Sequence, residues 1–455
     1  MLTEKQRQIK NTIIYTLPLV ITSILPLVTL PIFTRILTPN DYGNLGLAMV
    51  YASAVGGLSN FGMSLVFDRN FFQYNQDKIK LSKLFYSSLL FIYFNFIILL
   101  CLTVIYRENI STYLTGTTQN SNLILITFCA FFIINISNNF FYILFKNSEK
   151  AEIFSKFKII ETLLNTIIAL LLVVYFRIGV IGIVYGQLIA GLLLFSIFIN
   201  ITLRELPFYL SLSLLFKSLK ISYPLTPKIL IGIINTQFDK FMIGMLNTVT
   251  SVGIYHIGKR ISEIIFNFMT VLQNVYHPQI YKRMFNNHEQ GSESIGKYLT
   301  PFLYMSTSIA LSVALFSEEI LTLLTPSDYH KASPIISILS MYYGSMFFGK
   351  IPQLMYAKKT HILSILIIFA TILNIILNIP FIIKYGAIGA AWATLISGLI
   401  SGITSLIISQ HYYRILYEWD KVLWIMGNFF CGSSIITVML LLNAPYTWNI
   451  IVKII

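Results

Sequence analysis

Three charged residues lie in an otherwise apolar stretch of the sequence, "VGIYHIGKRISEIIFNF" (252–268). They are Lys259, Arg260 and Glu263, and the two cations outnumber the one carboxylate. A charge at the centre of a bilayer costs about 2.5–3.5 kcal/mol on insertion scales, so three would cost roughly 8–10 kcal/mol. Such charges are retained where they line water or bind an ion, and a surplus of positive charge would bind an anion.

The polar residues of this stretch share one side of a helix. At 100° per residue, one stripe contains His256, Lys259, Arg260, Glu263, Asn267, Thr270 and Asn274. The opposite side contains Ile257, Ile261, Ile265, Phe268 and Leu272. Lys259 and Arg260 lie about 12 Å from the expected outer end of the helix, near the middle of a ~30 Å hydrocarbon core. The pattern predicts a stripe facing a water-filled cavity; the alternative is an internal ion pair, because Glu263 follows Lys259 by four residues and Arg260 by three.

The preceding apolar segment repeats the pattern with Lys228, Gly232, Asn235 and Asp239 on one face. Lys228 could instead extend to the inner membrane surface, and Asp239 could form an interfacial pair with Lys240. Lys350, in "MFFGKIPQLMYAKK", either lines the same cavity or extends to the surface. These residues are secondary candidates for the same anion site.

Catalytic and cofactor signatures do not stand out in the sequence. The six histidines are scattered, and the three cysteines lie inside apolar runs, where they are expected to be small core residues. We find no nucleophile–base pair, no metal-ligand cluster and no phosphate-binding loop. The sequence therefore predicts a protein that is not an enzyme, with no cofactor, no metal and no ATP-driven step.

The elements that must position these residues are membrane-spanning helices. The chain has 455 residues, of which 56% are hydrophobic and 11% charged, whereas soluble domains have about 25% charged residues. The N-terminal apolar run is too long for a signal peptide and lacks a cleavage site, so we expect it to be retained as a helix. The fold class is an all-α polytopic membrane protein. The expected spans are 12–34, 43–66, 84–106, 121–145, 157–176, 179–202, 222–245, 252–276, 298–323, 333–356, 361–383, 386–411 and 421–443.

The positive charges orient these spans and account for the net charge of +14 without a nucleic-acid partner. With the N-terminus inside, most Lys and Arg residues fall in the inner segments. The outer loops contain only Arg35, Arg107, Arg177, Lys331 and Lys384. The segment 444–455 is too short to span and is expected to lie in the interface.

An internal repeat relates the two halves of the chain. "GVIGIVYGQLIAGLL" (179–193) resembles "GAIGAAWATLISGLI" (386–400), 207 residues further on. "RILTPNDYG" (35–43) matches "MLNTVTSVG" (245–253) at an offset of 210. We therefore expect two parallel six-helix bundles, 1–210 and 211–413, around a central cavity, and an extra helix with an interfacial tail, 414–455.

Two motifs resemble those of the polysaccharide flippases of the MOP exporter superfamily. The first outer loop of that family typically reads Arg-x-Leu-x-Pro-x-x-Tyr-Gly, which Arg35, Leu37, Pro39, Tyr42 and Gly43 fit here. The second is the "DK…IG…VGIY" signature, fitted by Asp239, Lys240, Ile243, Gly244, Val252, Gly253 and Tyr255. The resemblance covers about 10–413. The chain departs from it at the C-terminus, where relatives often have a complete fourteenth helix.

The resemblance implies a flippase that moves undecaprenyl-pyrophosphate-linked oligosaccharide across the bacterial cytoplasmic (inner) membrane by alternating access. The glycan would belong to O-antigen, lipopolysaccharide, capsule or exopolysaccharide. Arg260 and Lys259 would attract the pyrophosphate, with Lys228 and Lys350 as secondary cations and Asn235 and Asn267 as polar contacts for the sugars. Glu263, His256 or Asp239 would couple transport to protons or sodium. Membrane lipids and polysaccharide polymerase or chain-length proteins would be its partners.

Three other functions remain open from the sequence. A lipid-linked peptidoglycan precursor flippase would also bind a pyrophosphate, although it usually has fourteen full helices. A multidrug exporter of the same superfamily usually carries cations and would favour acidic residues in its cavity. A membrane glycan polymerase or ligase would usually have a large outer loop with catalytic Arg or His, and the longest outer loop here, "YRENISTYLTGTTQNSN", is short.

Overall fold

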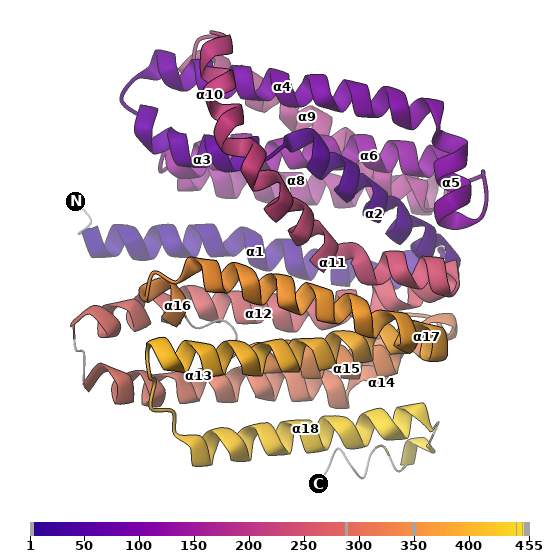
Figure 1. The fold of residues 1–455 in the computed structure, drawn as a ribbon. Coiled ribbons are helices and arrows are strands. Elements are labelled where there is room, and N and C mark those ends of the chain that lie inside the picture. The colour runs from indigo at the N-terminus through magenta and orange to yellow at the C-terminus, as the bar shows by residue number, and fades with distance from the viewer. Residues whose placement is uncertain (1–3, 287–289, 348–351, 443, 448, 450–455) are drawn as a thin grey trace. The chain divides into compact units, whose positions relative to one another are not determined.

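The computed structural model is α-helical in the part of the chain that it describes, residues 4–286, 290–347, 352–442, 444–447 and 449 (Figure 1). No strand occurs among these residues, which confirms the expected all-α class. The helices are α1 (Glu4–Thr34), α2 (Pro39–Asn60), α3 (Met63–Tyr74), α4 (Lys78–Ile105), α5 (Arg107–Thr115), α6 (Ser121–Ile136), η1 (Ser137–Phe141), α7 (Tyr142–Asn147), α8 (Ala151–Leu170), η2 (Leu171–Tyr175), α9 (Ile181–Glu205), α10 (Leu212–Ser222), η3 (Tyr223–Leu225), α11 (Thr226–Leu246), α12 (Val249–Asn286), α13 (Gln290–Leu315), α14 (Ser317–Leu324), η4 (Ser327–Ala332), α15 (Ser333–Ser345), α16 (Gln353–Tyr356), α17 (Thr360–Tyr412) and α18 (Trp419–Leu441).

Many of these helices have the length and composition of membrane spans. In the described part of the chain, nine helices qualify, or ten if α2 and α3, which are bent by 44°, form one span. The three other expected spans fall on α12, on α15 and on the second part of α17. The chain is thus a multi-pass membrane protein. Each of the thirteen expected spans overlaps a described helix, and residues 348–351 of the span 333–356 and residue 443 of the span 421–443 lie outside the described residues.

The helix α17 contains two expected spans in one continuous element. Its 53 residues would extend about 80 Å at 1.5 Å per residue, far more than a ~30 Å hydrocarbon core requires. The backbone leaves the helical conformation at Gly386, with φ 57° and ψ −135°, a region that only glycine occupies readily. Gly386 therefore divides α17 into two segments that match the expected spans 361–383 and 386–411.

The chain separates by its internal contacts into two compact units, Met1–Gly244 and Met245–Ile455. The expected bundles 1–210 and 211–413 rest on sequence repetition rather than on contacts, so their boundaries stay a prediction.

An aromatic core holds the first unit together. Phe67, Phe85, Phe140, Phe141 and Phe198 are all 0–1% exposed. Neighbouring rings among them pack at centroid distances of 5.4–5.5 Å, as between Phe67 and Phe140 or Phe141 and Phe198, which is in the range of favourable aromatic pairs. These residues come from α3, α4, η1 and α9, so the core fixes the helices that surround the η1 turn.

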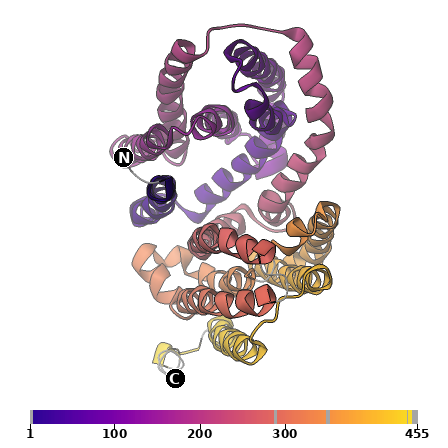
Figure 2. The ribbon, with the colours of Figure 1, turned by 90° about the vertical axis from the view of Figure 1, so that its left-hand side faces the viewer.

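In the second unit, α15 is the central helix. Residues 333–341 of α15 are buried without interruption, and α15 packs against α12, α13, α17 and α18. These helices run side by side in Figure 1, and Figure 2 shows them nearly end-on. A helix buried on all sides is the expected position for an apolar segment such as "SPIISILSMYY".

The two halves share local backbone features at the offsets found in the sequence. Thr38 caps α2 by accepting a hydrogen bond from Asp41 N at 3.3 Å, and Thr248 caps α12 in the same way from Ser251 N at 3.2 Å. Gly179 and Gly386 both have positive φ, 73° and 57°.

The turns after the fourth and tenth expected spans also correspond. Glu149 and Lys358 both have a φ of 56°. The amide of the next residue donates a 2.9 Å hydrogen bond to the carbonyl oxygen five residues before it, from Lys150 N to Phe145 O and from Lys359 N to Leu354 O. This is a helix C-cap of the Schellman type. The sequence repeat is therefore accompanied by a repeat of capping geometry.

Candidate functional site

The candidate anion site lies on α12, whose start is fixed by a local cap. Thr248 Oγ1 accepts from Ser251 N, and Ser251 Oγ donates to Asn247 Oδ1 at 2.6 Å. Because the cap sets the first helical turn, it also sets the rotation at which every later side chain leaves the helix.

One side of α12 packs tightly on α15. Ile257, Ile261 and Ile265 are 0% exposed. A Cβ added to Gly258 would lie 2.9 Å from Ile335 Cγ2, and Ser262 Oγ donates to Ile336 O at 3.3 Å. The expected apolar face is therefore the packing face, and the close approach at Gly258 leaves no alternative rotation for the helix.

The polar stripe points away from that packing face. Lys259, Arg260 and Glu263 are half-buried, whereas Asn267 and Asn274 are exposed. The Lys259 Nζ lies 5.8 Å from the centre of the Tyr255 ring, within the range of a cation–π contact. His256 is more enclosed than the stripe pattern implies, at 6% exposure.

The internal ion pair considered for this stripe does not form. Within the described residues, the ion pairs do not include Glu263 with either Lys259 or Arg260. The stripe therefore keeps its charges apart, with two cations and one carboxylate on the same side of one helix. Cations that are not neutralised by the carboxylate of their own stripe can bind an anion.

The candidate residues of α11 are divided by burial. Asn235 is exposed, and a Cβ added to Gly232 would meet no atom within 4 Å, so this part of the helix has open space beside it. Asp239 and Lys240 are 5% and 8% exposed. Lys228 lies on α11, but its side chain is outside the described part, and Lys350 lies outside the described residues.

The motif residues of the first loop build the turn between α1 and α2. Pro39 occupies the first position of α2. Asp41 Oδ2 accepts a 2.8 Å hydrogen bond from Thr38 N, which completes a capping box. Tyr42 and Gly43 are buried, while Arg35 is exposed. This arrangement gives Pro39, Tyr42 and Gly43 a structural explanation and leaves Arg35 available to solvent.

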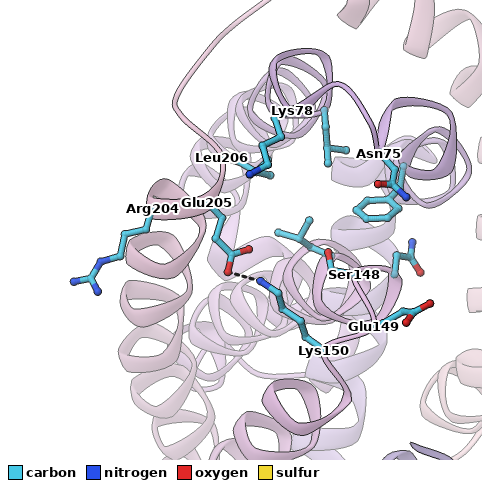
Figure 3. A pocket seen from close by; sticks show the side chains of 12 residues that line it. Asn75, Lys78, Ser148, Glu149, Lys150, Arg204, Glu205 and Leu206 are labelled. Carbon is cyan, nitrogen blue, oxygen red and sulfur yellow. Dashed lines mark hydrogen bonds and ion pairs between the residues drawn. The ribbon is translucent and has the colours of Figure 1, made fainter. Parts of the chain in front are cut away.

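A cavity of about 590 Å³ lies within the first unit, where α3, α7 and α9 end and α4 and α8 begin. Figure 3 shows Lys78 and Lys150 directed toward it, an ion pair between Lys150 and Glu205, and Arg204 directed away. None of the predicted site residues lines this cavity. A group of charges in the expected inner loops is the one sequence feature that points to it.

The sequence reasoning also missed a charged cluster inside the first unit. Lys158 and Glu161 on α8 form an ion pair with Nζ to Oε2 at 2.9 Å. The signal that could have found the pair is its i, i+3 spacing within a helix that has the composition of a span.

Comparison with known proteins identifies the family of the chain. The family described as "Polysaccharide biosynthesis protein" matches residues 9–284. A relative from Haloferax volcanii, described as a probable low-salt glycan biosynthesis flippase, is 23% identical over 198 residues. That match covers 42% of this chain and 42% of the relative, so the chain aligns with less than half the length of this curated relative.

Solved structures share the fold across most of the chain. The Lipid II flippase MurJ in an inward closed conformation matches 97% of each chain, with a TM-score of 0.74 and 19% identity. A multidrug resistance transporter of the MATE family matches 87% of this chain and 97% of its own, with a TM-score of 0.61 and 18% identity. A MOP superfamily transporter from Pyrococcus furiosus matches 88% and 95%, with a TM-score of 0.57 and 16% identity. The family match and the flippase relative confirm the expected resemblance to polysaccharide flippases. The solved neighbours, which are flippases and transporters, share the fold.

Proposed function

The chain belongs to the polysaccharide biosynthesis protein family, and we propose that it is a flippase that moves a lipid-linked oligosaccharide across a membrane. The family assignment, the glycan flippase relative and the fold of membrane transporters all support a transport role. We propose undecaprenyl-pyrophosphate-linked oligosaccharide as the substrate and alternating access as the mechanism.

The single observation that carries the proposal is the unbalanced polar stripe of α12. Two cations and one carboxylate lie on one side of the helix without forming an ion pair with one another. A diphosphate has at least two negative charges and several acceptor oxygens, which match a guanidinium and an ammonium on adjacent positions. A cationic drug would meet repulsion at the same place.

The roles of the individual residues follow from their chemistry. Arg260 would hold the pyrophosphate through two parallel hydrogen bonds, and Lys259 would add a point charge. Lys228 and Lys350 are proposed as further cations on the path. Asn235 and Asn267, which are exposed, would offer hydrogen bonds to sugar hydroxyl groups without selecting a particular sugar.

Coupling to an ion is proposed for the acidic and histidine groups near the stripe. Glu263 is the carboxylate of the stripe itself, and His256 lies two turns before it. Asp239 is a further candidate on α11. If Glu263 exchanges protons during transport, Glu263→Gln should remove the pH dependence of transport, whereas an unchanged pH profile would exclude this role.

The experiment for the proposed function is glycan display by a strain that lacks its own flippase and expresses this protein. Arg260→Ala should abolish surface glycan while the protein still inserts at the normal level. Lys331→Ala is the matched control, because it removes an exposed cation of the second unit that lies outside the stripe. Full glycan display by Arg260→Ala would refute the anion site.

Two related functions are distinguished by expressing the protein in further test strains. A peptidoglycan precursor flippase is the second candidate, because the MurJ structure matches 97% of each chain. Rescue of growth after depletion of the host lipid II flippase, without glycan display, would favour that function. Increased drug resistance without either effect would favour a multidrug exporter.

We further propose that the protein lies in a bacterial cytoplasmic membrane with its N-terminus inside, as the distribution of Lys and Arg indicates. Polysaccharide polymerase and chain-length proteins would then act on its product on the outer side.

A further inference from the structure

A cluster of four polar side chains lies inside the first unit, apart from the α12 stripe. Tyr142 Oη donates to Glu161 Oε2 at 2.8 Å, and Lys158 Nζ donates to the same oxygen at 2.9 Å. Lys158 Nζ also donates to Asn138 Oδ1 at 2.8 Å and lies 4.9 Å from the centre of the Tyr142 ring. The cluster thus joins α8 to α7 through Glu161 Oε2 and to η1 through Lys158 Nζ.

The cluster lies deep in a candidate membrane span. The span that contains α8 is Ala151–Tyr175. Glu161 is ten residues from the start of that segment, or about 15 Å along the helix axis at 1.5 Å per residue. The Glu161 side chain is 10% exposed and that of Lys158 is 23% exposed. The Lys158 side chain as a whole is therefore the more accessible of the two.

Aromatic side chains enclose the cluster. The Tyr142 ring contacts Phe154 and Phe198 at 5.4 Å each, and Phe157 contacts Phe198 at 5.2 Å. Such surroundings have a low polarity, in which a change of one charge has a larger energetic effect than in water.

A π-helical turn brings Asn138 to the ammonium. The helix η1 (Ser137–Phe141) interrupts the α-helical path between α6 and α7. A π turn shifts the angle at which the flanking side chains leave the helix, and such turns are common at functional sites. Asn138 lies within this π turn and Tyr142 follows it directly. Both polar residues that contact the Lys158–Glu161 pair therefore lie in the π turn or next to it.

The carboxylate of Glu161 uses only one of its oxygens. Both hydrogen bonds end on Oε2. Among the described residues, none donates to Oε1, and this oxygen is not fully enclosed by protein atoms. An ionised carboxylate has about four acceptor positions, so Oε1 is open to a proton.

Among the side chains that the structure describes, no other ionisable group on the elements packed against α8 compensates for this carboxylate. On α9, the close approach of Gly186 to Ala169 and to Asn165 O sets the register between α8 and α9. This register places the apolar side chains of Leu194 and Phe198 beside the cluster. The ionisable residues of α9 are at least two helical turns away; they are Tyr185, Arg204 and Glu205. On α7, the ionisable residues are Tyr142 and Lys146. The helix α1 also packs on α8 and contains Glu4, Lys5, Arg7, Lys10 and Tyr15, whose side chains are outside the described part.

We propose that Glu161, together with Lys158, Tyr142 and Asn138, is a proton-exchange site that couples proton movement to transport. This proposal rests on the transport role proposed above and adds a coupling site to the α12 candidates. With Glu161 ionised and Lys158 charged, the cluster has no net charge. A proton that binds at Oε1 converts the carboxylate to a neutral acid and leaves a net charge of +1 on Lys158.

A purely structural ion pair is the competing explanation. Removing two charges from water costs several kcal/mol per ion, and apolar replacements of such pairs are often neutral or stabilising. If the cluster is only structural, the double variant Lys158→Met with Glu161→Gln should therefore behave like the wild type. If the cluster exchanges protons, that double variant should fold but lose coupling.

The first experiment measures protonation directly, without any cargo. Infrared difference spectra of the full chain in lipid vesicles, recorded between about pH 6 and about pH 8, report the carboxyl groups that change protonation in this interval, in which exposed carboxylates stay ionised. Glu161→Gln should remove one component of that band, whereas Glu108→Gln, which changes an exposed carboxylate on α5, should leave it. A Glu161→Gln spectrum with every wild-type component would overturn the proposal.

The second experiment measures coupling in the glycan display strain. Glu161→Gln and the double variant should each reduce surface glycan at least tenfold at a normal protein level. Wild-type display by the double variant would overturn the coupling role. If the wild-type protein itself displays no glycan, the proposed function fails, and the infrared experiment still decides whether Glu161 exchanges a proton.

Discussion

Gly389→Ala should disrupt the approach between the two segments of α17. A Cβ at this position would lie 1.9 Å from the carbonyl oxygen of Phe381 and 2.4 Å from its carbonyl carbon. Carbon–oxygen contacts between backbones are about 3.3 Å or longer, so the backbone must move by more than about 1 Å. Added methyl groups in packed sites typically destabilise by about 1–3 kcal/mol, and we expect the upper end because no flexible side chain can give way.

The assay is the thermal midpoint of the purified protein in detergent, followed by size-exclusion chromatography of heated samples. Gly402→Ala is the matched control, because it lies on the same helix and its Cβ would meet no atom within 4 Å. Alanine is favoured over glycine in a helix by about 1 kcal/mol, so this control should be neutral or stabilised. Gly182→Ala should fall between them, because its nearest neighbour at 2.9 Å is the Val173 side chain. Equal midpoints for Gly389→Ala and Gly402→Ala would refute the steric argument.

The remaining predictions concern caps, strain and pH, and each is checked by the same thermal assay. Thr38→Ala and Thr248→Ala should each destabilise by about 1 kcal/mol, because each removes the side chain that caps its helix; a loss in only one variant would contradict the repeated cap. Gly386→Ala should cost about 1–3 kcal/mol, because its φ of 57° strains any other residue. The hydrogen bonds that Lys421 and Thr300 donate lower the pKa of Glu418. The stabilisation from Glu418 is therefore present above the ordinary carboxyl range and is lost as the pH falls through the lowered pKa. Wild type should lose thermal stability on acidification, Glu418→Gln should show a flatter profile, and parallel profiles would exclude this contribution.

The periodicity of α12 was sufficient to predict which of its faces is buried. Ile257, Ile261 and Ile265 are fully buried, as a 3.6-residue period requires. The charge pairing could not be predicted from spacing, because Lys259 lies over Tyr255, one turn toward the N-terminus. Long side chains on a helix lean in that direction, so the spacing from Lys259 to Glu263 permitted a pair without requiring one.

The cluster around Glu161 could not be predicted for a different reason. Its expected span began at residue 157, and the structure extends the helix back to Ala151, so Lys158 changes from a boundary residue to an interior one. The partners Asn138 and Tyr142 are about 20 residues away. They meet the pair only because of a π turn, for which the sequence has no periodic signal.

The shared capping geometry of the two halves has a consequence for chimaeras built from them. At the offset of the shared turns, Lys158 and Glu161 correspond to Ile367 and Ala370, and at the offset of the shared caps, Lys259 and Arg260 correspond to Met49 and Val50. Under the predicted two-copy organisation, the copies share their turns and differ in their charges, with one set on the fifth expected span of the first copy and the other on the second expected span of the second copy. A chimaera with two copies of the first half would therefore lack Lys259 and Arg260, and one with two copies of the second half would lack Lys158 and Glu161.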